Sequence, residues 1–446
     1  MAALAAKRPD LVVNLSASPF TRGKRGKRNR VFADKARVLG CPLAYVNCTG
    51  IQNNGKTLYT FDGSGTVYGS DGAVLEELPA YEETAKVVEI EGPRVRWTSA
   101  ASVAKNPEPG SIAEIHAALR YGAREFLAST GLKRVVIGAS GGIDSAVSAA
   151  LFREVLEPRD LLLVNMPSRF NSATTRGLAR ALADNLGCLY AEVPIEDSLA
   201  VARAQLHGLE AFSADGSLHA TLKLEGLADE NAQARDRGAR VLAGAAQAFG
   251  AVFSCNANKA ELTVGYGTLY GDIAGFLAPL GDLWKGDVYA VGHFLNESVY
   301  GREVIPEGIF DIVPSAELGA HQAVDEGKGD PLHYAYHDRL FFAWVQRWQR
   351  ATPEEILEWY AAGVLSAELG LPADVDLKKL FPTPADFVAD LERWWNLYNG
   401  IGVAKRVQAP PVLAVSSRAF GFDHREALGR AVYTERYREL KKKLLG

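Results

Sequence analysis

The hydrophobic pattern of the first hundred residues predicts short β-strands. Apolar or alternating runs there end at Ser, Pro or Gly residues, which are typical of turns. The predicted strands are Asp10–Leu15, Leu43–Asn47 and Thr57–Asp62. The segment Ser99–Gly110, which contains Asn106-Pro107-Glu108-Pro109-Gly110, predicts a linker, so we expect a domain boundary there.

From Ile112 onward, strand and helix patterns alternate along the chain. Apolar residues recur at three- and four-residue steps from Ile112 to Phe126, as in an amphipathic helix. The later apolar runs do not alternate, which is typical of strands buried on both faces. Because such a succession builds βαβ units, it predicts a doubly wound parallel sheet over residues 111–330. The expected strands are Arg134–Ala139, Leu161–Met166, Leu189–Ile195 and Ala251–Cys255, and the expected helices are Ala146–Leu156, Thr174–Leu186 and Ala232–Ala248.

The remaining residues, 331–446, predict a helical C-terminal extension. Thr352 precedes Pro353 and has Glu355 three residues on, which is the signature of a capped helix start. The predicted domains are therefore residues 1–100, 111–330 and 331–446. Four tryptophans of the extension are expected in the core or in a subunit contact: Trp344, Trp348, Trp394 and Trp395.

The composition is that of a globular protein rather than a fibrous or disordered one. The chain has 446 residues, with 48% hydrophobic and 23% charged positions. A net charge of -4 argues against nucleic-acid binding, and we interpret the basic run Arg22–Arg30 as a charged loop. No apolar run is long enough to predict a membrane span or a secretory signal. We expect a cytoplasmic protein whose scattered thiols stay reduced: Cys41, Cys48, Cys188 and Cys255.

The string Ser140-Gly141-Gly142-Ile143-Asp144-Ser145 lies between a predicted strand and a predicted helix. Its glycines let the backbone approach an anion, and the N–H groups at the helix start point toward the ligand. The charge of Asp144 would repel a bare anion, but it is explained if Mg²⁺ bridges it to phosphate oxygens. A glycine-rich turn can also be purely structural. The full string in this setting favours phosphate binding, and it matches neither GxxxxGK[ST] nor GxGxxG.

This string resembles the pyrophosphate loop of the ATP pyrophosphatases, which cleave ATP to AMP and pyrophosphate. Further downstream, segments such as Glu230–Arg237 (ENAQARDR) and Asn256–Asp272 (NANKAELTVGYGTLYGD) resemble segments of the NAD synthetases, and more closely those of the glutamine-dependent type than of the ammonia-dependent type. The resemblance covers about residues 112–430. It implies an adenine nucleotide alpha hydrolase-like fold and the amidation of deamido-NAD to NAD through an adenylated intermediate. The segments that carry it are Glu230–Arg237 (ENAQARDR), Asn256–Asp272 (NANKAELTVGYGTLYGD), Pro279–Val288 (PLGDLWKGDV), Pro314–Leu318 (PSAEL) and Lys405-Arg406.

The resemblance also implies roles for single residues. It implies that Asp144 and Lys285 are catalytic and that Asp144 and Glu261 hold Mg²⁺. Asn256 stands where the family usually has threonine against ATP. The implied ATP-binding residues are Gly138, Ala139, Ser140, Gly141, Gly142, Ile143, Asp144, Ser145, Asn256, Lys285 and Ser315, and the implied substrate-binding residues are Asn231, Arg235, Glu261 and Lys405.

Each of these residues also has a purely structural interpretation. Lys285 and Arg235 could be surface charges, and Glu261 could complement a helix dipole. Ser315 could cap a helix that begins at Ala316. Their joint occurrence with the loop favours the functional interpretation.

The first hundred residues resemble the late part of a nitrilase-like glutaminase domain. Asn14–Phe20 carries this likeness, and it implies residual glutamine-binding positions at Ser18 and Lys24. The family's Cys, Glu and Lys triad lies upstream of this segment, so we expect the chain to lack it; Cys41 and Cys48 do not match the nucleophile. A fragment, a misplaced start or one half of a split enzyme would each explain this.

The resemblance implies ATP, deamido-NAD and ammonia as substrates. The charge balance and the lack of a long apolar run argue against nucleic acid and a membrane as partners. A partial nitrilase-like sandwich would expose an apolar face and a sheet edge, which favours association with a separate glutaminase subunit. We also expect a homo-oligomer. The alternatives are a GMP synthetase-like or tRNA-modifying enzyme of the same superfamily, and a regulatory subunit that binds nucleotide without turnover.

Overall fold

A computed structural model of the chain describes residues 1–91, 94–97, 105–420 and 431–446. Packing divides it into two compact units, one of Met1–Gly131 with Leu413–Ala419, the other of Leu132–Val412 with Phe420–Gly446. Helix α3 (Ile112–Thr130) belongs to the first unit, although the sequence analysis grouped it with the second domain. The reason is that α3 packs on the neighbouring strands β3 and β4 of the first unit. Part of the predicted linker lies outside the described residues, and the three predicted domain limits stay predictions.

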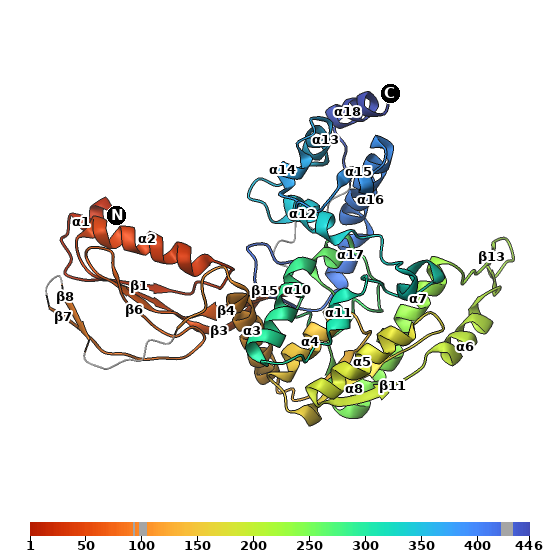
Figure 1. The fold of residues 1–446 in the computed structure, drawn as a ribbon, viewed down its shortest axis with the longest axis horizontal. Coiled ribbons are helices and arrows are strands. Elements are labelled where there is room, and N and C mark those ends of the chain that lie inside the picture. Colours follow the sequence, from red (N-terminus) through yellow and green to blue (C-terminus); the bar gives the residue numbers. More distant parts are fainter. Residues whose placement is uncertain (92–93, 98–104, 421–430) are drawn as a thin grey trace. The chain divides into compact units, whose positions relative to one another are not determined.

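The first unit contains a four-stranded sheet in the order β1-β2-β5-β6 (Figure 1). β1 and β2 are parallel, and the other neighbours are antiparallel. Helix α2 (Lys24–Leu39) covers one face, where Ala36, Leu43 and Tyr68 are buried. The strands of the unit are β1 (Val12–Ser16), β2 (Leu43–Asn47), β3 (Thr49–Asn54), β4 (Thr57–Asp62), β5 (Thr66–Tyr68), β6 (Val74–Glu77), β7 (Val88–Glu91) and β8 (Arg94–Trp97), with a short helix α1 (Ala2–Ala5) and part of β15 (Val412–Ala414).

The interpretation of Arg22–Arg30 as a loop is wrong, because most of this run forms the start of α2. Arg25 and Arg28 are both buried, each 7% exposed. Arg28 pairs with Asp62 at 3.0 Å, and Arg25 pairs with Glu77 at 3.0 Å. Asp62 lies in β4 and Glu77 in β6. Because these carboxylates neutralise two of its arginines, the helix can carry several cations without strong mutual repulsion.

The second unit is built on a parallel sheet in the order β11-β10-β9-β14. The chain begins at β9, adds β10 and β11 on one side, and returns to place β14 on the other side of β9. This order confirms the predicted doubly wound sheet and puts its switch point next to β9. The strands are β9 (Val135–Gly138), β10 (Leu161–Asn165), β11 (Leu189–Glu192) and β14 (Val252–Phe253).

Helices cover both faces of this sheet, so β9 is buried on both sides; Val135, Val136 and Ile137 are at most 1% exposed. α4 and α5 connect successive strands, while α6, η2 and α8 share an apolar cluster with Val136 and Val164. The helices are α4 (Ile143–Arg153), α5 (Ala173–Leu186), α6 (Glu196–Leu206), α7 (Leu227–Arg235), η2 (Asp236–Leu242) and α8 (Ala243–Phe249), with a short helix η1 (Pro158–Asp160) before β10.

Two predicted elements of the second unit also differ from the structure. The helix expected over Ala232–Ala248 begins earlier, at Leu227, and contains the π-helical turn η2. The expected strand Ala251–Cys255 keeps only two paired residues. Hydrophobic periodicity cannot separate an α-turn from a π-turn, and an apolar run does not show where strand pairing stops.

The C-terminal part of the second unit is helical, as predicted. Trp344 and Trp394 lie in its core, Trp395 is partly buried, and Trp348 is 94% exposed. The capping box of Thr352 and Glu355 is confirmed. No helix among the described residues has the length and apolar character of a membrane span. The helices are α9 (Lys259–Val264), α10 (Lys285–Phe294), η3 (Leu295–Val299), α11 (Glu307–Asp311), η4 (Ala320–Gln322), η5 (Val324–Glu326), α12 (Tyr334–Val345), α13 (Pro353–Ala361), α14 (Leu365–Leu369), α15 (Leu377–Leu380), α16 (Pro384–Asn399), α17 (Ile401–Gln408) and α18 (Glu435–Leu445).

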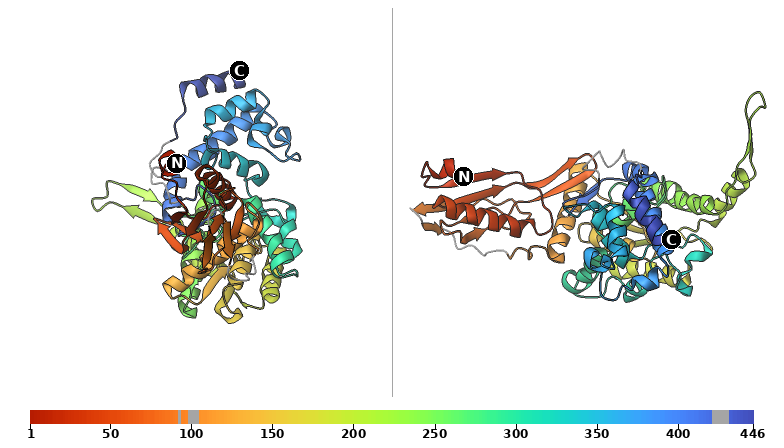
Figure 2. Two further views of the ribbon diagram at one scale, coloured as in Figure 1. Left: turned by 90° about the vertical axis from the view of Figure 1, so that its left-hand side faces the viewer. Right: turned by 90° about the horizontal axis from the view of Figure 1, so that it is seen from above.

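A two-stranded hairpin projects from the second unit between α6 and α7. It is formed by β12 (Glu210–Phe212) and β13 (His219–Thr221), which pair antiparallel (Figure 2). Phe212 and Leu218 are 67% and 71% exposed, so the hairpin carries apolar side chains into solvent.

The loop after β9 offers a matched pair of glycine substitutions. Gly141 has φ of +87°, and a Cβ there would collide with the Thr175 carbonyl oxygen. Gly142 has φ of −95°, and its Cβ would meet only Ser140 Oγ, at 3.4 Å. We expect Gly141→Ala to lower the free energy of unfolding by at least about 1–3 kcal/mol, because the strain adds to the collision. Gly142→Ala should change it by less than about 1 kcal/mol. Urea titration would measure both, and equal stability of the two variants would contradict the structure of the loop.

Candidate active site

The glycine loop lies at the carboxyl end of β9, where the sheet order reverses. Ser140 Oγ accepts a hydrogen bond from the Gly142 N–H at 3.2 Å, and Ser145 Oγ donates to the Gly142 carbonyl at 2.9 Å. These bonds hold the turn that leads into α4, so the first N–H groups of the helix face the open end of the sheet. The structure therefore confirms the predicted strand–turn–helix setting of the loop.

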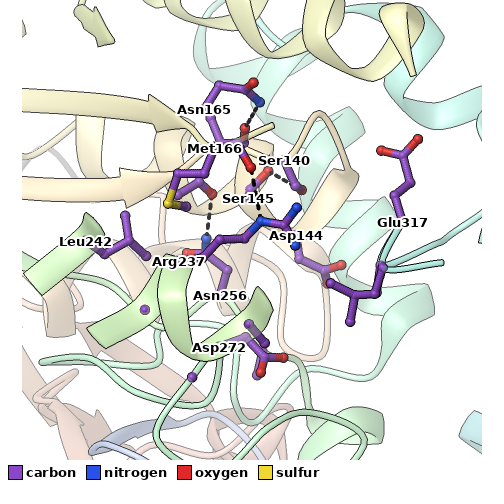
Figure 3. A pocket seen from close by; sticks show the side chains of 18 of the residues that line it. Ser140, Asp144, Ser145, Asn165, Met166, Arg237, Leu242, Asn256, Asp272 and Glu317 are labelled. Atoms are coloured by element: carbon purple, nitrogen blue, oxygen red, sulfur yellow. Dashed lines mark hydrogen bonds between the residues drawn. The ribbon is translucent and has the colours of Figure 1, made fainter. Parts of the chain in front are cut away.

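Two adjoining cavities open at this position, and they share Ser140, Asp144 and Glu261. The Arg237 lobe has a volume of about 240 Å³ and includes Arg237 and Asn256. The Lys285 lobe has a volume of about 140 Å³ and includes Lys285. Figure 3 shows Arg237 in the middle of the first lobe, with Met166 and Leu242 on one side and Asp144 and Glu317 on the other.

Asp144 is at the centre of a polar network in the shared part of the cavities. One carboxylate oxygen is paired with the Lys285 ammonium, and the other accepts from Asn258 Nδ2 at 3.1 Å. Asn258 also forms a reciprocal capping box with Glu261 at the start of α9. Tyr334 Oη donates to the other oxygen of Glu261 at 3.2 Å. Residues from α4, α9, α10 and α12 are thereby joined around one charge pair.

The electrostatics of this network depend on the balance between burial and charge. Burial, together with the neighbouring charge of Asp144, raises the pKa of Glu261 to about 8. Burial alone would lower the pKa of Lys285, but Asp144 and Glu261 outweigh that effect and raise it above its usual value. Lys285 is only 3% exposed and stays charged at neutral pH. The surface-charge interpretation of Lys285 is therefore wrong.

Asp144 and Glu261 are the carboxylates on which a divalent cation could bind. No cluster of three or more His, Cys, Asp or Glu side chains able to hold a metal occurs in the described part of the chain. A Mg²⁺ ion usually takes one or two protein carboxylates and completes its shell with water and phosphate oxygens. The raised pKa of Glu261 indicates a carboxylate pair that a nearby cation would relieve. The two residues fit a cation that arrives with a phosphate ligand.

Asn256 and Ser315 also line the cavities. Asn256 Nδ2 donates to the Gly138 carbonyl at 3.1 Å, and its buried Oδ1 has no hydrogen-bond partner among the described residues. Ser315 Oγ donates to the Gln322 carbonyl at 2.7 Å and accepts from the Glu317 N–H at 3.2 Å. No helix begins at Ala316, so the helix-cap interpretation of Ser315 is wrong; its hydroxyl stabilises a loop instead.

The other implied substrate residues form a second group around the loop Gly265–Asp272. Asn231 accepts from Thr268 Oγ1 at 2.7 Å, Arg235 Nε donates to the Leu269 carbonyl at 3.1 Å, and Lys405 Nζ donates to the Gly265 carbonyl at 2.7 Å. None of these three side chains lines either lobe, although Gly271 and Asp272 at the end of the same loop do. These three implied substrate residues therefore contact the loop, whereas Glu261 lines both lobes together with implied ATP residues.

Sequence reasoning missed several polar residues that line the cavities. Glu317 is 3% exposed and accepts from Asn171, from the Ser172 N–H and from Thr175, at 2.8–3.1 Å. Its φ of +47° is uncommon for a residue other than glycine and marks a constrained loop. Arg237 stands in the same ENAQARDR segment as Arg235, but only the tertiary structure shows which of the two arginines enters the cavity.

A fully buried ion pair lies behind the network. Lys259 and Asp282 are paired at 2.6 Å, with both side chains 0% exposed, and Lys259 Nζ also donates to Gln346 Oε1 at 3.0 Å. Lys259 follows Asn258 directly, and Asp282 precedes Lys285 by three residues. The pair therefore connects the start of α9 to the loop that immediately precedes Lys285.

The first unit holds the positions that resemble a glutamine site. Asn47 bonds to both the N–H and the carbonyl of Ser18, and Lys24 Nζ donates to the Pro19 carbonyl at 2.6 Å. Burial raises the pKa of the Cys41 thiol, with a smaller contribution from Asp10. A thiol with a raised pKa is a poor nucleophile at neutral pH.

A parallel sheet with a glycine-rich loop and a cavity at its switch point defines a doubly wound α/β protein. The family model of NAD synthase matches residues 115–362, and the chain belongs to that family. The resemblance drawn from the sequence motifs is thereby confirmed, and the GMP synthetase-like and tRNA-modifying alternatives are not favoured.

Curated relatives extend this result. The glutamine-dependent NAD(+) synthetase of Rhodobacter capsulatus is 34% identical over 327 residues, which cover 72% of this chain and 56% of that protein. The enzyme of the same name from Xylella fastidiosa strain 9a5c is 31% identical over 95% of this chain and 69% of its own length. The chain thus spans little more than half of the first relative.

Solved structures agree on the fold. The glutamine-dependent NAD+ synthetase of Acinetobacter baumannii, solved with ADP, gives a TM-score of 0.61 at 24% identity over 94% of this chain and 68% of that one. The enzyme from Cytophaga hutchinsonii gives a TM-score of 0.70 at 17% identity over 99% of this chain and 71% of that one. This likeness spans both units and confirms the predicted α/β fold class.

The buried pair behind the network can be tested by neutralising one member. In Asp282→Asn the ammonium of Lys259 stays buried without its carboxylate, so we expect a loss of about 3–5 kcal/mol in the free energy of unfolding. The control is Glu326→Gln, which breaks a pair with Lys328 whose side chains are 63% and 51% exposed and should cost less than about 1 kcal/mol. Chemical denaturation of the three proteins gives both values, and similar losses in the two variants would show that the buried pair has no special role.

Proposed function

We propose that this chain catalyses the ATP-dependent amidation of deamido-NAD to NAD, with release of AMP and pyrophosphate. The observation that carries the proposal is the Asp144–Lys285 pair at the open end of β9, directly behind an anion-binding loop. Family membership and the names of the relatives support it. The ADP in the Acinetobacter structure supports nucleotide binding by this fold.

The chemistry that such a site must perform is the activation of a carboxylate. Ammonia does not displace a carboxylate oxygen, so that oxygen first takes the AMP group of ATP while the bond to pyrophosphate breaks. Negative charge builds on the leaving pyrophosphate, and preorganised donors that face such charge lower the barrier most. Lys285 and the N–H groups at the start of α4 are placed to do this. Ammonia then attacks the mixed anhydride, loses a proton, and AMP leaves.

Asp144 and Glu261 are the proposed carboxylate ligands of Mg²⁺. When bound, the ion would neutralise phosphate charge and orient the leaving group. In the protein, Asp144 also keeps Lys285 charged, and Asn258 orients Asp144 from the start of α9. The residues of the chain thus set the position of the lysine before any nucleotide arrives.

The group around the loop Gly265–Asp272 is the proposed deamido-NAD site. Burial lowers the pKa of Lys405, and the nearby charge of Arg235 lowers it further, against an opposing effect of Asp272. Two neighbouring cations, one from α7 and one from α17, contact this loop, and such a pair suits a dinucleotide that carries phosphates and a carboxylate. We assign Asn231 to the same site because it orients Thr268 in that loop.

We also propose ammonia as the direct nitrogen donor and an assembly of more than one chain. The face of the first sheet opposite α2 exposes Val13, Leu15 and Val46 by 53%, 79% and 48%. Apolar sheet faces of this kind are usually covered by a partner. A separate glutaminase subunit would suit this face, and Ser18 and Lys24 would then belong to a glutamine site completed by that subunit.

The assignment of Asp144 and Lys285 can be tested on the first half-reaction. We expect Asp144→Asn and Lys285→Ala each to slow pyrophosphate release by about 10²–10³, since each removes a group that acts on developing phosphate charge. The matched control is Lys328→Ala, which removes an exposed lysine of the same unit and should leave the rate unchanged. Circular dichroism would verify folding. Release at the parent rate in either active-site variant would refute the assignment.

The nitrogen donor can be tested with the purified chain of the printed sequence. We expect NAD to form with ammonium and not with glutamine, because Cys41 is buried with a raised thiol pKa and neither Cys41 nor Cys48 matches the family nucleophile. The measurements are NAD formation with each donor and glutamate release from glutamine. Glutamine-driven turnover that disappears in Cys41→Ala or Cys48→Ala would show that one of these thiols is a nucleophile after all.

A further inference from the structure

Arg237 lies in the π-helical turn η2, and its side chain lines the Arg237 lobe (Figure 3). Its Nε donates to the Met166 carbonyl at 3.0 Å, and its Nη2 donates to Asn171 Oδ1 at 2.9 Å. A guanidinium carries five N–H donors. Nη1 makes no hydrogen bond to any residue that the structure describes, so donors remain available on the cavity side.

The charge of Arg237 has no ion-pair partner among the residues that the structure describes. No carboxylate oxygen lies within 4.0 Å of it in the described part of the chain, in contrast to Arg203 and Arg240, whose carboxylates lie at 2.6 and 2.7 Å. Burial lowers the pKa of Arg237 to about 10, against opposing effects of Asp272 and Glu317, so it is still charged at neutral pH. A desolvated cation with only neutral partners is costly, and an anion in the cavity would offset that cost.

The lining of the lobe indicates which anion this is. Met166, Ala234 and Leu242 give the Arg237 lobe an apolar wall, which suits a nucleoside. Lys285 lines the other lobe and not this one. The shared residues Ser140 and Asp144 lie between the two. A nucleotide across both lobes would therefore present the phosphate nearest its nucleoside to Arg237 and its terminal phosphates to Lys285.

We propose that Arg237 binds the α-phosphate of the adenylate group, in ATP, in the adenylated intermediate and in AMP. This proposal depends on the proposed function for the identity of the nucleotide. In the first step the substrate carboxylate oxygen bonds to the α-phosphorus, and the bond to the β-phosphate oxygen breaks. In the second step the carbonyl carbon bonds to nitrogen, and its bond to the adenylate oxygen breaks. Arg237 thus faces the α-phosphate, which stays bound through both steps. Lys285 faces the β- and γ-phosphates, which leave as pyrophosphate in the first step.

The competing explanation is that Arg237 only braces the cavity wall through Met166 and Asn171. Asp272 and Glu317 would also oppose an anion, although the Asp272 carboxylate is held by the Thr268 N–H at 2.7 Å and Glu317 by three donors of its own. A brace would affect every ligand of the lobe alike. A phosphate contact would affect only ligands that carry a phosphate.

Calorimetric titration of AMP, adenosine and pyrophosphate separates these explanations. We expect Arg237→Gln to weaken AMP binding at least about tenfold, as for a charge-assisted hydrogen bond, and adenosine and pyrophosphate binding less than about threefold. Lys285→Ala should do the reverse, weakening pyrophosphate and sparing AMP. The matched control is Arg240→Gln, which lies in the same turn, pairs with Asp236 and should change none of the three affinities. Equal losses for AMP and adenosine in Arg237→Gln, or no loss for AMP, would overturn the proposal.

A second variant covers the case in which Arg237→Gln does not fold. Arg237→Lys keeps the charge but cannot bridge Met166 and Asn171, so the proposal expects it to retain the preference for AMP over adenosine. Loss of that preference would overturn it. Turnover of deamido-NAD by the unmodified chain is measured separately. A chain that makes NAD but does not prefer AMP to adenosine would refute the role of Arg237 and still support the proposed function.

Discussion

The ion pair between Asp144 and Lys285 is the contact on which the candidate active site depends. Lys285 is almost fully buried, and a buried ammonium without a carboxylate would tend to lose its proton or to disrupt the fold around it. Asp144 lies in the first turn of α4, and Lys285 begins α10. One charge pair thereby joins the glycine loop to an element that lies far along the chain. Asn258 adds the start of α9 to the same point.

The strand order explains why this point is open to a ligand. Because β10 and β14 lie on opposite sides of β9, the connections after these strands diverge and leave a crevice at the carboxyl end of β9. The loop that fills the crevice is constrained by packing, since Gly141 lies against the backbone of α5. The turn η2 closes the other side of the crevice and brings Arg237 into it.

The buried charged residues of this protein differ in whether they line a cavity of the candidate site. Arg28 with Asp62 and Lys259 with Asp282 are buried pairs that join elements within their own units. Each is buried and lines neither of the two lobes of the candidate site. The Asp144–Lys285 pair lines a cavity, and Arg237 lines one without a carboxylate partner among the described residues. Lys285 and Arg237 therefore face space in which a ligand could bind, and the two structural pairs do not.

The residues expected around the glycine loop came from the resemblance to the NAD synthetases. The sequence pattern by itself determined the parallel sheet and the place of the loop. These features depend on local patterns, such as unbroken apolar strands and glycines between a strand and a helix, which are visible without tertiary contacts. One exception in the fold, the helical start of α2, depends on distant partners. Arg25 and Arg28 are stabilised in α2 by the carboxylates of Glu77 in β6 and Asp62 in β4.

Only the tertiary structure decided which of two arginines in one motif enters the cavity. Arg235 and Arg237 are two positions apart, and their side chains leave the helix in different directions, one toward the Leu269 carbonyl and the other toward Met166 and Asn171. It also decided that Ser315 stabilises a loop and that Glu317 accepts hydrogen bonds from the first turn of α5 and the two residues before it. Side-chain direction and long-range pairing arise from packing between segments far apart in the chain, and no local pattern records them.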